Sequence, residues 1–317
     1  RHRFPFDPRY GYGLEELLAL GPPPEPPDFV PFWTRRYGAA LALDPAPRLQ
    51  PSDIQRPGFQ VQDLTYGSTS GFTIRGWLLE PRSARPRCGL ILGHGYGGVD
   101  QPPEPLPIED AVYLIPCFRG LSRSRCPSIS ADPVWHVVHD IQDRDRYVLG
   151  GCVEDLWTGV SALLQCFPEL AGHLGYLGIS FGGGIGALAL PWEPRIGRGH
   201  LNVPSFGHQP LRLKLPTLGS GDSVQRFARL HGDVLGTLAY YDAAVAARHI
   251  RQPMHVAAAL FDPAVAPPGQ FAIYNALTGP KRLFVREAGH FEYPGQARQE
   301  RELLAELRDF LAPLRAG

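Results

Sequence analysis

The chain has 317 residues, which is long enough for one large α/β domain or for two small ones. Its 31 basic and 31 acidic residues give a formal net charge of zero, which argues against binding to nucleic acid or to an anionic membrane. It contains no apolar run of about eighteen residues, the length that a membrane-spanning helix requires.

The cysteine pattern predicts reduced thiols in a cytoplasmic protein. The five cysteines are odd in number and widely spaced, and they include no C-x-x-C pair. The N-terminal segment lacks the apolar core of a signal peptide, but the sequence begins with Arg1, so a removed signal stays open as the alternative. His136 and His139 have no further metal ligand near them in the sequence, and neither a metal nor another cofactor is expected.

The N-terminal part of the chain predicts helices that pack on a larger body. Residues 1–50 hold a short helical stretch and a proline-rich break. Residues 27–43 then carry apolar residues at helical spacing, and Phe29, Phe32 and Trp33 are expected to face the main body.

The remaining elements alternate between strands and helices. In chain order they are an antiparallel hairpin of strands at 59–65 and 72–81, strands at 88–98 and 111–118, a helix over 140–168, a strand before Ser180, a strand within 198–206, helices over 222–250, strands at 252–263 and 281–290, and an amphipathic helix over 296–314. This alternation predicts an α/β fold with a largely parallel, doubly wound sheet. No linker divides the chain, so one domain over 1–317 is expected, with 1–50 as a helical extension packed on it.

Ser180 lies in the pattern G-x-S-x-G, from Gly178 to Gly182. The apolar "GYLGI" precedes the serine and a run of small residues follows it, as expected for a strand, a sharp turn and a helix. Such a turn projects the serine hydroxyl from the top of the sheet, above free N–H groups at the helix start. We therefore predict a nucleophile, with a non-catalytic serine in a glycine-rich turn as the alternative.

Two further residues complete a predicted Ser-His-Asp triad. In this type of site the chain order is serine, acid, histidine, and Ser180, Asp262 and His290 follow it. Asp262 and His290 each follow a predicted strand, so both are expected at the sheet edge where Ser180 lies. Asp262 could instead cap the turn before the next proline. The sequence offers two rival acids, Asp222 and Asp233.

An oxyanion hole is expected from two backbone N–H groups. One belongs to Phe181, directly after the nucleophile, and the other to Tyr96 in the glycine loop "HGYGG" at 94–98. The Tyr96 side chain is then expected to shape the acyl pocket. The alternative for this loop is a simple turn.

Several segments resemble the acetyl xylan esterase and cephalosporin C deacetylase family, carbohydrate esterase family seven. The segments are "PDFVPFW", "GFTIRGWLLEP", "GYGG", "NVPSFGH", the helical stretch over 140–168 and, most closely, residues 238–277. The resemblance covers nearly the whole chain and implies an α/β-hydrolase fold, with Tyr96 as an oxyanion donor. It also implies a homo-oligomer, commonly a cytosolic hexamer with an enclosed site.

Three positions depart from the family's motifs. Leu121 stands for the glutamine of "R-G-Q", Phe181 for that of "G-x-S-Q-G", and Phe291 for the glutamate of "H-E", with Glu292 one place later. The surroundings of the nucleophile are thereby expected to be more apolar. The candidates for lining the substrate pocket are Tyr96, Arg119, Leu121, Phe206 and Phe291, although an internal ion pair is an equal alternative for Arg119.

The expected function is that of a serine esterase on a small-molecule ester. The resemblance implies deacetylation of acetylated sugars such as xylo-oligosaccharides, or of cephalosporin-like acetates. One alternative is an acyltransferase, or a hydrolase of a secondary-metabolite ester, with the same triad. Another is a non-catalytic ligand-binding protein on the same fold.

Overall fold

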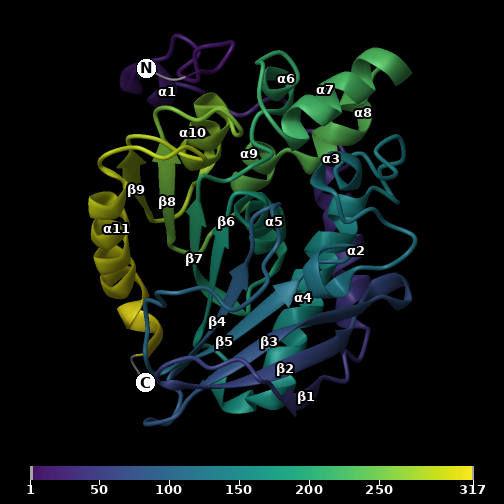
Figure 1. Cartoon of the computed structure of the whole chain (residues 1–317). Coiled ribbons are helices and arrows are strands. Elements are labelled where there is room, and N and C mark those ends of the chain that lie inside the picture. Colours follow the sequence, from purple (N-terminus) through teal and green to yellow (C-terminus); the bar gives the residue numbers. More distant parts are fainter. Residues whose placement is uncertain (1–2, 316–317) are drawn as a thin grey trace.

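This computed structural model describes residues 3–315. Their central feature is a mixed sheet of nine strands (Figure 1). The strands are β1 (Arg48–Pro51), β2 (Phe59–Gly67), β3 (Thr73–Pro81), β4 (Cys88–Gly93), β5 (Ala111–Cys117), β6 (Leu174–Ile179), β7 (Ile196–Asn202), β8 (Met254–Ala259) and β9 (Lys281–Arg286). Their order is β1-β2-β3-β5-β4-β6-β7-β8-β9. The pairs β1–β2, β2–β3 and β3–β5 are antiparallel. The pairs β5–β4, β4–β6, β6–β7, β7–β8 and β8–β9 are parallel. The predicted α/β fold with a largely parallel sheet is confirmed.

Helices cover both faces of this sheet. They are α1 (Leu14–Leu18), α2 (Phe29–Leu41), α3 (Pro133–His136), α4 (Val148–Cys166), α5 (Phe181–Ala189), α6 (Gln209–Arg212), α7 (Ser220–His231), α8 (Leu235–Leu238), α9 (Ala243–Ala247), α10 (Pro267–Ala276) and α11 (Gln296–Leu311). Helix α11 lies on the opposite face from α4 and α5, as its position in Figure 1 shows. Within residues 3–315, no helix combines the length and the apolar character needed to cross a bilayer.

Buried apolar side chains alternate between the two faces. Tyr113 and Leu114 follow one another in β5 and are both fully buried, but they belong to opposite cores. Successive side chains of a strand point to opposite faces, so a strand covered on both sides is apolar throughout. Phe310 and Leu311 of α11 pack in the same core as Tyr113.

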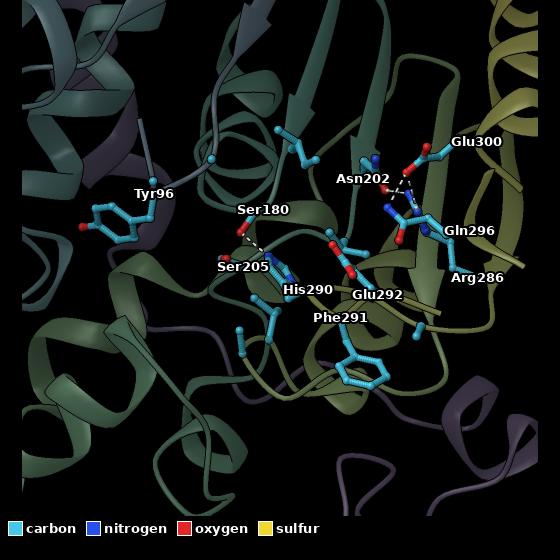
Figure 2. Close-up of a pocket in the computed structure, with 18 of the residues that line it drawn as sticks. Tyr96, Ser180, Asn202, Ser205, Arg286, His290, Phe291, Glu292, Gln296 and Glu300 are labelled. Atoms are coloured by element: carbon cyan, nitrogen blue, oxygen red, sulfur yellow. Dashed lines mark hydrogen bonds and ion pairs between the residues drawn. The ribbon is translucent and has the colours of Figure 1, made fainter. Parts of the chain in front are cut away.

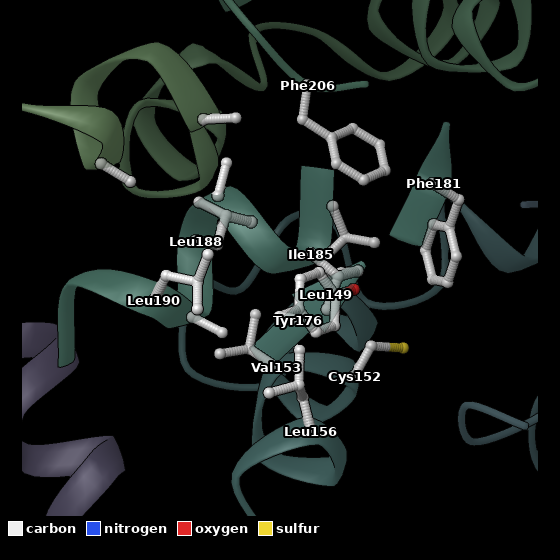
Figure 3. Packing of buried hydrophobic residues seen from close by; sticks show 14 of the residues in the cluster. Leu149, Cys152, Val153, Leu156, Tyr176, Phe181, Ile185, Leu188, Leu190 and Phe206 are labelled. Atoms are coloured by element: carbon white, nitrogen blue, oxygen red, sulfur yellow. The ribbon is translucent and has the colours of Figure 1, made fainter. Parts of the chain in front are cut away.

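Helix α5 is held between the sheet and helix α4. Figure 3 shows Ile185 and Leu188 of α5 packed with Leu149 and Val153 of α4 near Tyr176 of β6. All of α5 is buried, which explains its small and apolar composition. This packing fixes the start of α5, where the candidate nucleophile lies.

The N-terminal helix α2 lies against the main body. Phe29, Phe32 and Trp33 are buried, as the helical spacing predicts. The Trp33 ring meets Trp157 of α4 edge-on at 6.1 Å, and its indole Nε1 donates to the carbonyl oxygen of Tyr240 at 3.0 Å.

Several predicted boundaries are wrong. The helix predicted over 140–168 begins only at Val148, because Asp140 has a positive φ of 55° and the Asp143 side chain caps a turn through the N–H of Asp145. The region 222–250 is broken into short helices by Gly232, whose φ is 96°.

Strand β1 and helix α10 are absent from the predicted elements. Helix α10 is buried over most of its length, so it lacks the polar face that makes a surface helix recognisable in a sequence.

Candidate active site

Ser180 occupies a strained turn between β6 and α5. Its φ of 54° and ψ of −112° lie outside the regions that most residues adopt. Three backbone hydrogen bonds hold it there: its N–H donates to Asn202, and its carbonyl oxygen accepts from Gly184 and Ser205. Strain of this kind persists only where the surrounding structure fixes it, and it is typical of functional turns.

The two motif glycines allow the chain to pass closely at this turn. A Cβ atom at Gly182 would lie 2.3 Å from the carbonyl group of Gly93, and one at Gly178 would lie 2.4 Å from the Gly182 oxygen. A larger residue at Gly182 would therefore push the turn away from β4, and one at Gly178 would clash with the first turn of α5.

The structure brings the three predicted triad residues together. Figure 2 shows the contact between Ser180 and His290. His290 Nε2 lies 2.8 Å from Ser180 Oγ, and His290 Nδ1 lies 2.8 Å from Asp262 Oδ2. An ionised carboxylate only accepts hydrogen bonds, so Nδ1 carries the imidazole proton and Nε2 is free to accept the serine proton. This is the arrangement that an activated serine requires.

Asp262 is fully buried and its carboxylate is held from several sides. Oδ1 accepts the backbone N–H groups of Ala264 and Val265, each at 2.9 Å, and Oδ2 accepts the side-chain amide of Gln270 at 2.9 Å. The Asp262 carboxylate therefore does both things: Oδ1 caps the turn, as the alternative proposed, and Oδ2 contacts His290. Gln270 is not recognisable from the sequence, because it lies eight positions from Asp262 in helix α10, which is not among the predicted elements.

The electrostatic surroundings of His290 favour its protonated form. Burial lowers the pKa of His290, but the hydrogen bond and negative charge of Asp262 raise it by more, against a smaller lowering by Arg286. The net result is a pKa above the ordinary value of 6.5.

Two backbone N–H groups beside Ser180 lack a protein acceptor. They belong to Tyr96 and Phe181, and neither group donates to any atom of residues 3–315. The Tyr96 loop runs next to the serine, since a Cβ atom at Gly95 would lie 3.8 Å from the Ser180 Cβ. Both N–H groups are thus available to an anion formed at Ser180.

Ser180 and His290 open into a cavity of about 870 Å³. Two of the residues proposed for the substrate pocket, Tyr96 and Phe291, line this cavity, and Figure 2 shows the Tyr96 hydroxyl pointing away from Ser180. On the other side of Ser180 from Tyr96, the cavity has a polar wall formed by Asn202, Arg286 and Glu300, which are not among the predicted pocket residues. There Arg286 Nη1 donates to Asn202 Oδ1 at 3.2 Å, and these two residues end β9 and β7.

Three other predicted pocket residues do not line this cavity. The Arg119 guanidinium is buried and pairs with Asp155 at 2.7 Å, which is the internal ion pair weighed as its alternative. Leu121 is buried in the core, and Phe206 packs edge-on against Phe181 at 6.0 Å beside a separate small cavity. The prediction that Arg119, Leu121 and Phe206 line the substrate pocket is therefore wrong for this cavity, because all three side chains are buried inside the protein.

The rival acids and the histidine pair also lie apart from the triad. Asp222 pairs with Arg226 along α7, and Asp233 Oδ1 accepts the N–H of Leu235. Among the described residues, no group of three or more histidine, cysteine or acidic side chains is placed to hold a metal ion.

The chain is similar to known proteins both in sequence and in fold. The sequence model of the acetyl xylan esterase family (AXE1) matches residues 13–305. The structure resembles acetyl xylan esterase 1 from Thermoanaerobacterium sp. JW/SL YS485, with a TM-score of 0.78 and 20% identity over 95% of this chain and 99% of that one. For the acetyl xylan esterase from Paenibacillus sp. R4 the TM-score is 0.79, with 20% identity over 93% and 99%. The acylaminoacyl peptidase of Pyrococcus horikoshii shares the fold more distantly, with a TM-score of 0.63 and 15% identity over 81% and 42%.

Proposed function

Because the chain belongs to the acetyl xylan esterase family and is a carboxylic ester hydrolase of the α/β-hydrolase fold, we propose that it cleaves short acyl esters through Ser180, His290 and Asp262. The observation that carries this proposal is the position of His290, 2.8 Å from both Ser180 Oγ and Asp262 Oδ2. The preferred acyl group is acetyl.

Acylation begins with transfer of the Ser180 hydroxyl proton to His290 Nε2 as Oγ attacks the ester carbonyl carbon. The carbonyl oxygen becomes an anion and accepts hydrogen bonds from the N–H groups of Tyr96 and Phe181. Asp262 stabilises the positive imidazolium that forms in the same step. The intermediate then collapses: the bond from carbon to the alcohol oxygen breaks, and the alcohol leaves with the proton from His290.

Deacylation repeats these steps with water. His290 takes a proton from a water molecule, the resulting hydroxide attacks the acyl carbon, and the bond to Ser180 Oγ breaks as the serine regains its proton. The His290 side chain is 25% exposed, so water can approach it.

The proposed substrates are acetylated sugars, including xylo-oligosaccharides, and cephalosporin-like acetates. The family supports the acetyl group, and the cavity supports a bulky alcohol part. Its volume of about 870 Å³ is in the range of small-molecule sites, and its polar wall offers both the Arg286 guanidinium and the Glu300 carboxylate to hydroxyl groups.

Acyl-chain length tests the acetyl preference. With p-nitrophenyl acetate, butyrate and octanoate, kcat/KM is expected to be highest for acetate and lower by about tenfold or more for octanoate, because a pocket fitted to a short acyl group excludes extra methylenes. Release of acetic acid from acetylated xylo-oligosaccharides and from cephalosporin C then separates the two substrate classes. Faster cleavage of octanoate would contradict the acetyl preference, and acyl transfer to added alcohols exceeding hydrolysis would favour the acyltransferase alternative.

The pH profile tests the role of His290. Only its neutral form can accept the Ser180 proton, so kcat/KM is expected to fall as the solution is acidified through its pKa. Because that pKa is raised, the midpoint of the acidic limb is expected above 6.5. The measurement is kcat/KM for p-nitrophenyl acetate from about pH 5 to about pH 9, corrected for spontaneous hydrolysis. A midpoint below 6.5 would mean that burial and Arg286 outweigh Asp262.

A further inference from the structure

The Tyr96 side chain is tied to a buried histidine outside the triad. Tyr96 Oη lies 2.8 Å from His136 Nδ1, and His136 Nε2 lies 2.9 Å from the carbonyl oxygen of Arg119. A carbonyl oxygen can only accept, so His136 Nε2 carries the proton and donates it. Nδ1 must therefore accept, and the Tyr96 hydroxyl is its donor.

The hydrogen-bond partners fix the tautomer of His136, and burial keeps its imidazole neutral. His136 is fully buried, and burial lowers its pKa to about 4 despite the opposing effect of the Arg119 carbonyl. The imidazole consequently stays neutral at the pH values where His290 can act as a base. A neutral ring with one donor and one acceptor makes a directional link between Arg119 and Tyr96.

The Arg119 end of this link is rigid. The backbone N–H of Arg119 donates to Asp155 Oδ2 at 2.9 Å, and its guanidinium donates to both oxygens of the same buried carboxylate. Asp155 belongs to α4, and Gly120 turns the chain after Arg119 with a φ of 81°. His136 is therefore anchored to the body of the protein.

The Tyr96 end of the link contacts the other oxyanion donor. The Tyr96 ring stacks on Phe181 with 4.2 Å between ring centroids and 28° between planes. The His136 ring meets both of them edge-on, at 5.4 Å from Tyr96 and 6.2 Å from Phe181. The side chains of both residues proposed as oxyanion donors and the His136 ring thus pack together.

We propose that His136 is a positioning residue which, through the Tyr96 hydroxyl, holds the N–H groups of Tyr96 and Phe181 in the geometry of the oxyanion hole. This inference rests on the proposed function, because it assigns a task to that hole. His136 does not line the cavity and touches no reacting atom. Its effect reaches the reaction through the 94–98 loop and, by way of the ring contacts with Phe181, through the start of α5.

The kinetic consequence is specific to the transition state. Misplacing a catalytic group by about 1 Å can cost on the order of 100-fold in rate, and losing one oxyanion donor costs about 100- to 1,000-fold. Tyr96→Phe removes the tether but leaves the ring stack, so a smaller loss of about tenfold in kcat is expected. KM is expected to stay within about twofold, because the hole binds charge that the ground-state ester lacks.

The experiment compares kcat and KM for p-nitrophenyl acetate in Tyr96→Phe, His136→Leu, His136→Gln and the double variant Tyr96→Phe/His136→Leu. Acylation and deacylation both use the hole, so kcat falls whichever step is slower. The amide of His136→Gln offers a donor and an acceptor and is expected to retain more activity than His136→Leu. The double variant is expected to be no slower than His136→Leu alone, since both changes break one link.

Tyr113→Phe is the matched control. The Tyr113 hydroxyl is also buried and bonded to backbone, to both the N–H and the carbonyl of Ile108, but it lies in the opposite core. Its loss is expected to lower the melting temperature and to leave kcat unchanged. Should His136→Leu fail to fold, the near-isosteric Tyr96→Phe decides the matter alone.

Two outcomes distinguish a failure of the role proposed for His136 from a failure of the proposed esterase function. If Ser180→Ala is inactive and Tyr96→Phe keeps the wild-type kcat, or if Tyr113→Phe loses as much kcat as Tyr96→Phe, the role of His136 is overturned and the esterase proposal stands. If Ser180→Ala keeps full activity, the proposed function fails and the role of His136 fails with it.

Discussion

Replacing Ser180 with alanine is expected to lower kcat for p-nitrophenyl acetate by roughly 10⁵-fold or more. The Ser180 Oγ is the atom that would form the acyl-enzyme, and its 2.8 Å contact with His290 Nε2 is the means of its activation. Alanine retains the backbone hydrogen bonds to Asn202, Gly184 and Ser205, so the turn is expected to keep its form. The loss should therefore appear in the chemical step, with an unchanged melting temperature.

The matched control for this variant is Ser83→Ala. Ser83 is an exposed serine in a turn outside the cavity, and its replacement is expected to leave kcat and stability unchanged. Retention of more than about 1% of the wild-type kcat in Ser180→Ala would contradict a serine mechanism at this residue. Activity in this variant must be corrected for contaminating esterases, for which a second purification step is sufficient.

The second large effect is expected from Asp262→Asn, which should lower kcat by about 10⁴-fold. In the wild type, Oδ1 of Asp262 accepts the N–H groups of Ala264 and Val265. Only an oxygen can accept there, so the amide oxygen of the asparagine must replace Oδ1. The amide NH₂ then faces His290 Nδ1, which can only accept from it. The imidazole proton moves to Nε2, where it prevents the histidine from accepting the Ser180 proton.

This variant should also be less stable than the wild type. The Gln270 amide donates to Asp262 Oδ2 at 2.9 Å, and in Asp262→Asn it would meet another NH₂ group. Leaving a buried donor unpaired costs about 1–3 kcal/mol, which thermal or denaturant unfolding can measure. Asp233→Asn is the control, since this rival acid only caps the turn before Leu235 and should keep the wild-type kcat. A loss of less than about tenfold in Asp262→Asn, with a larger loss in Asp233→Asn or Asp222→Asn, would contradict the assignment of the acid.

The features that could be predicted from the sequence are local or fixed by chain order. The turn at Ser180 requires an apolar strand, close-packed glycines and a helix of small residues within a few positions, and all of these are visible in one segment. Asp262 and His290 follow strands that end at the same edge of the sheet, so their order along the chain was sufficient to propose them. The largely parallel sheet could likewise be predicted, because the alternation of strands and helices is visible in their order along the chain.

The features that could not be predicted depend on contacts between distant segments. His136 meets Tyr96 across 40 positions, and Gln270 reaches Asp262 from a helix with no polar face. Arg119 and Leu121 belong to the segment that resembles the family's "R-G-Q", but both side chains are buried and neither lines the cavity. A motif gives the position of a residue along the chain and leaves the direction of its side chain open.

Labelling of the wild-type protein with a p-nitrophenyl phosphonate is the direct test that Ser180 is the nucleophile. This reagent leaves a stable phosphonyl group on an activated serine and releases p-nitrophenol, which is measured against the loss of esterase activity. We expect one phosphonyl group per chain, located by mass spectrometry on the peptide that contains Ser180, with complete inactivation and no labelling of Ser180→Ala. An adduct on another residue of the inactivated protein, or full labelling of Ser180→Ala, would contradict it.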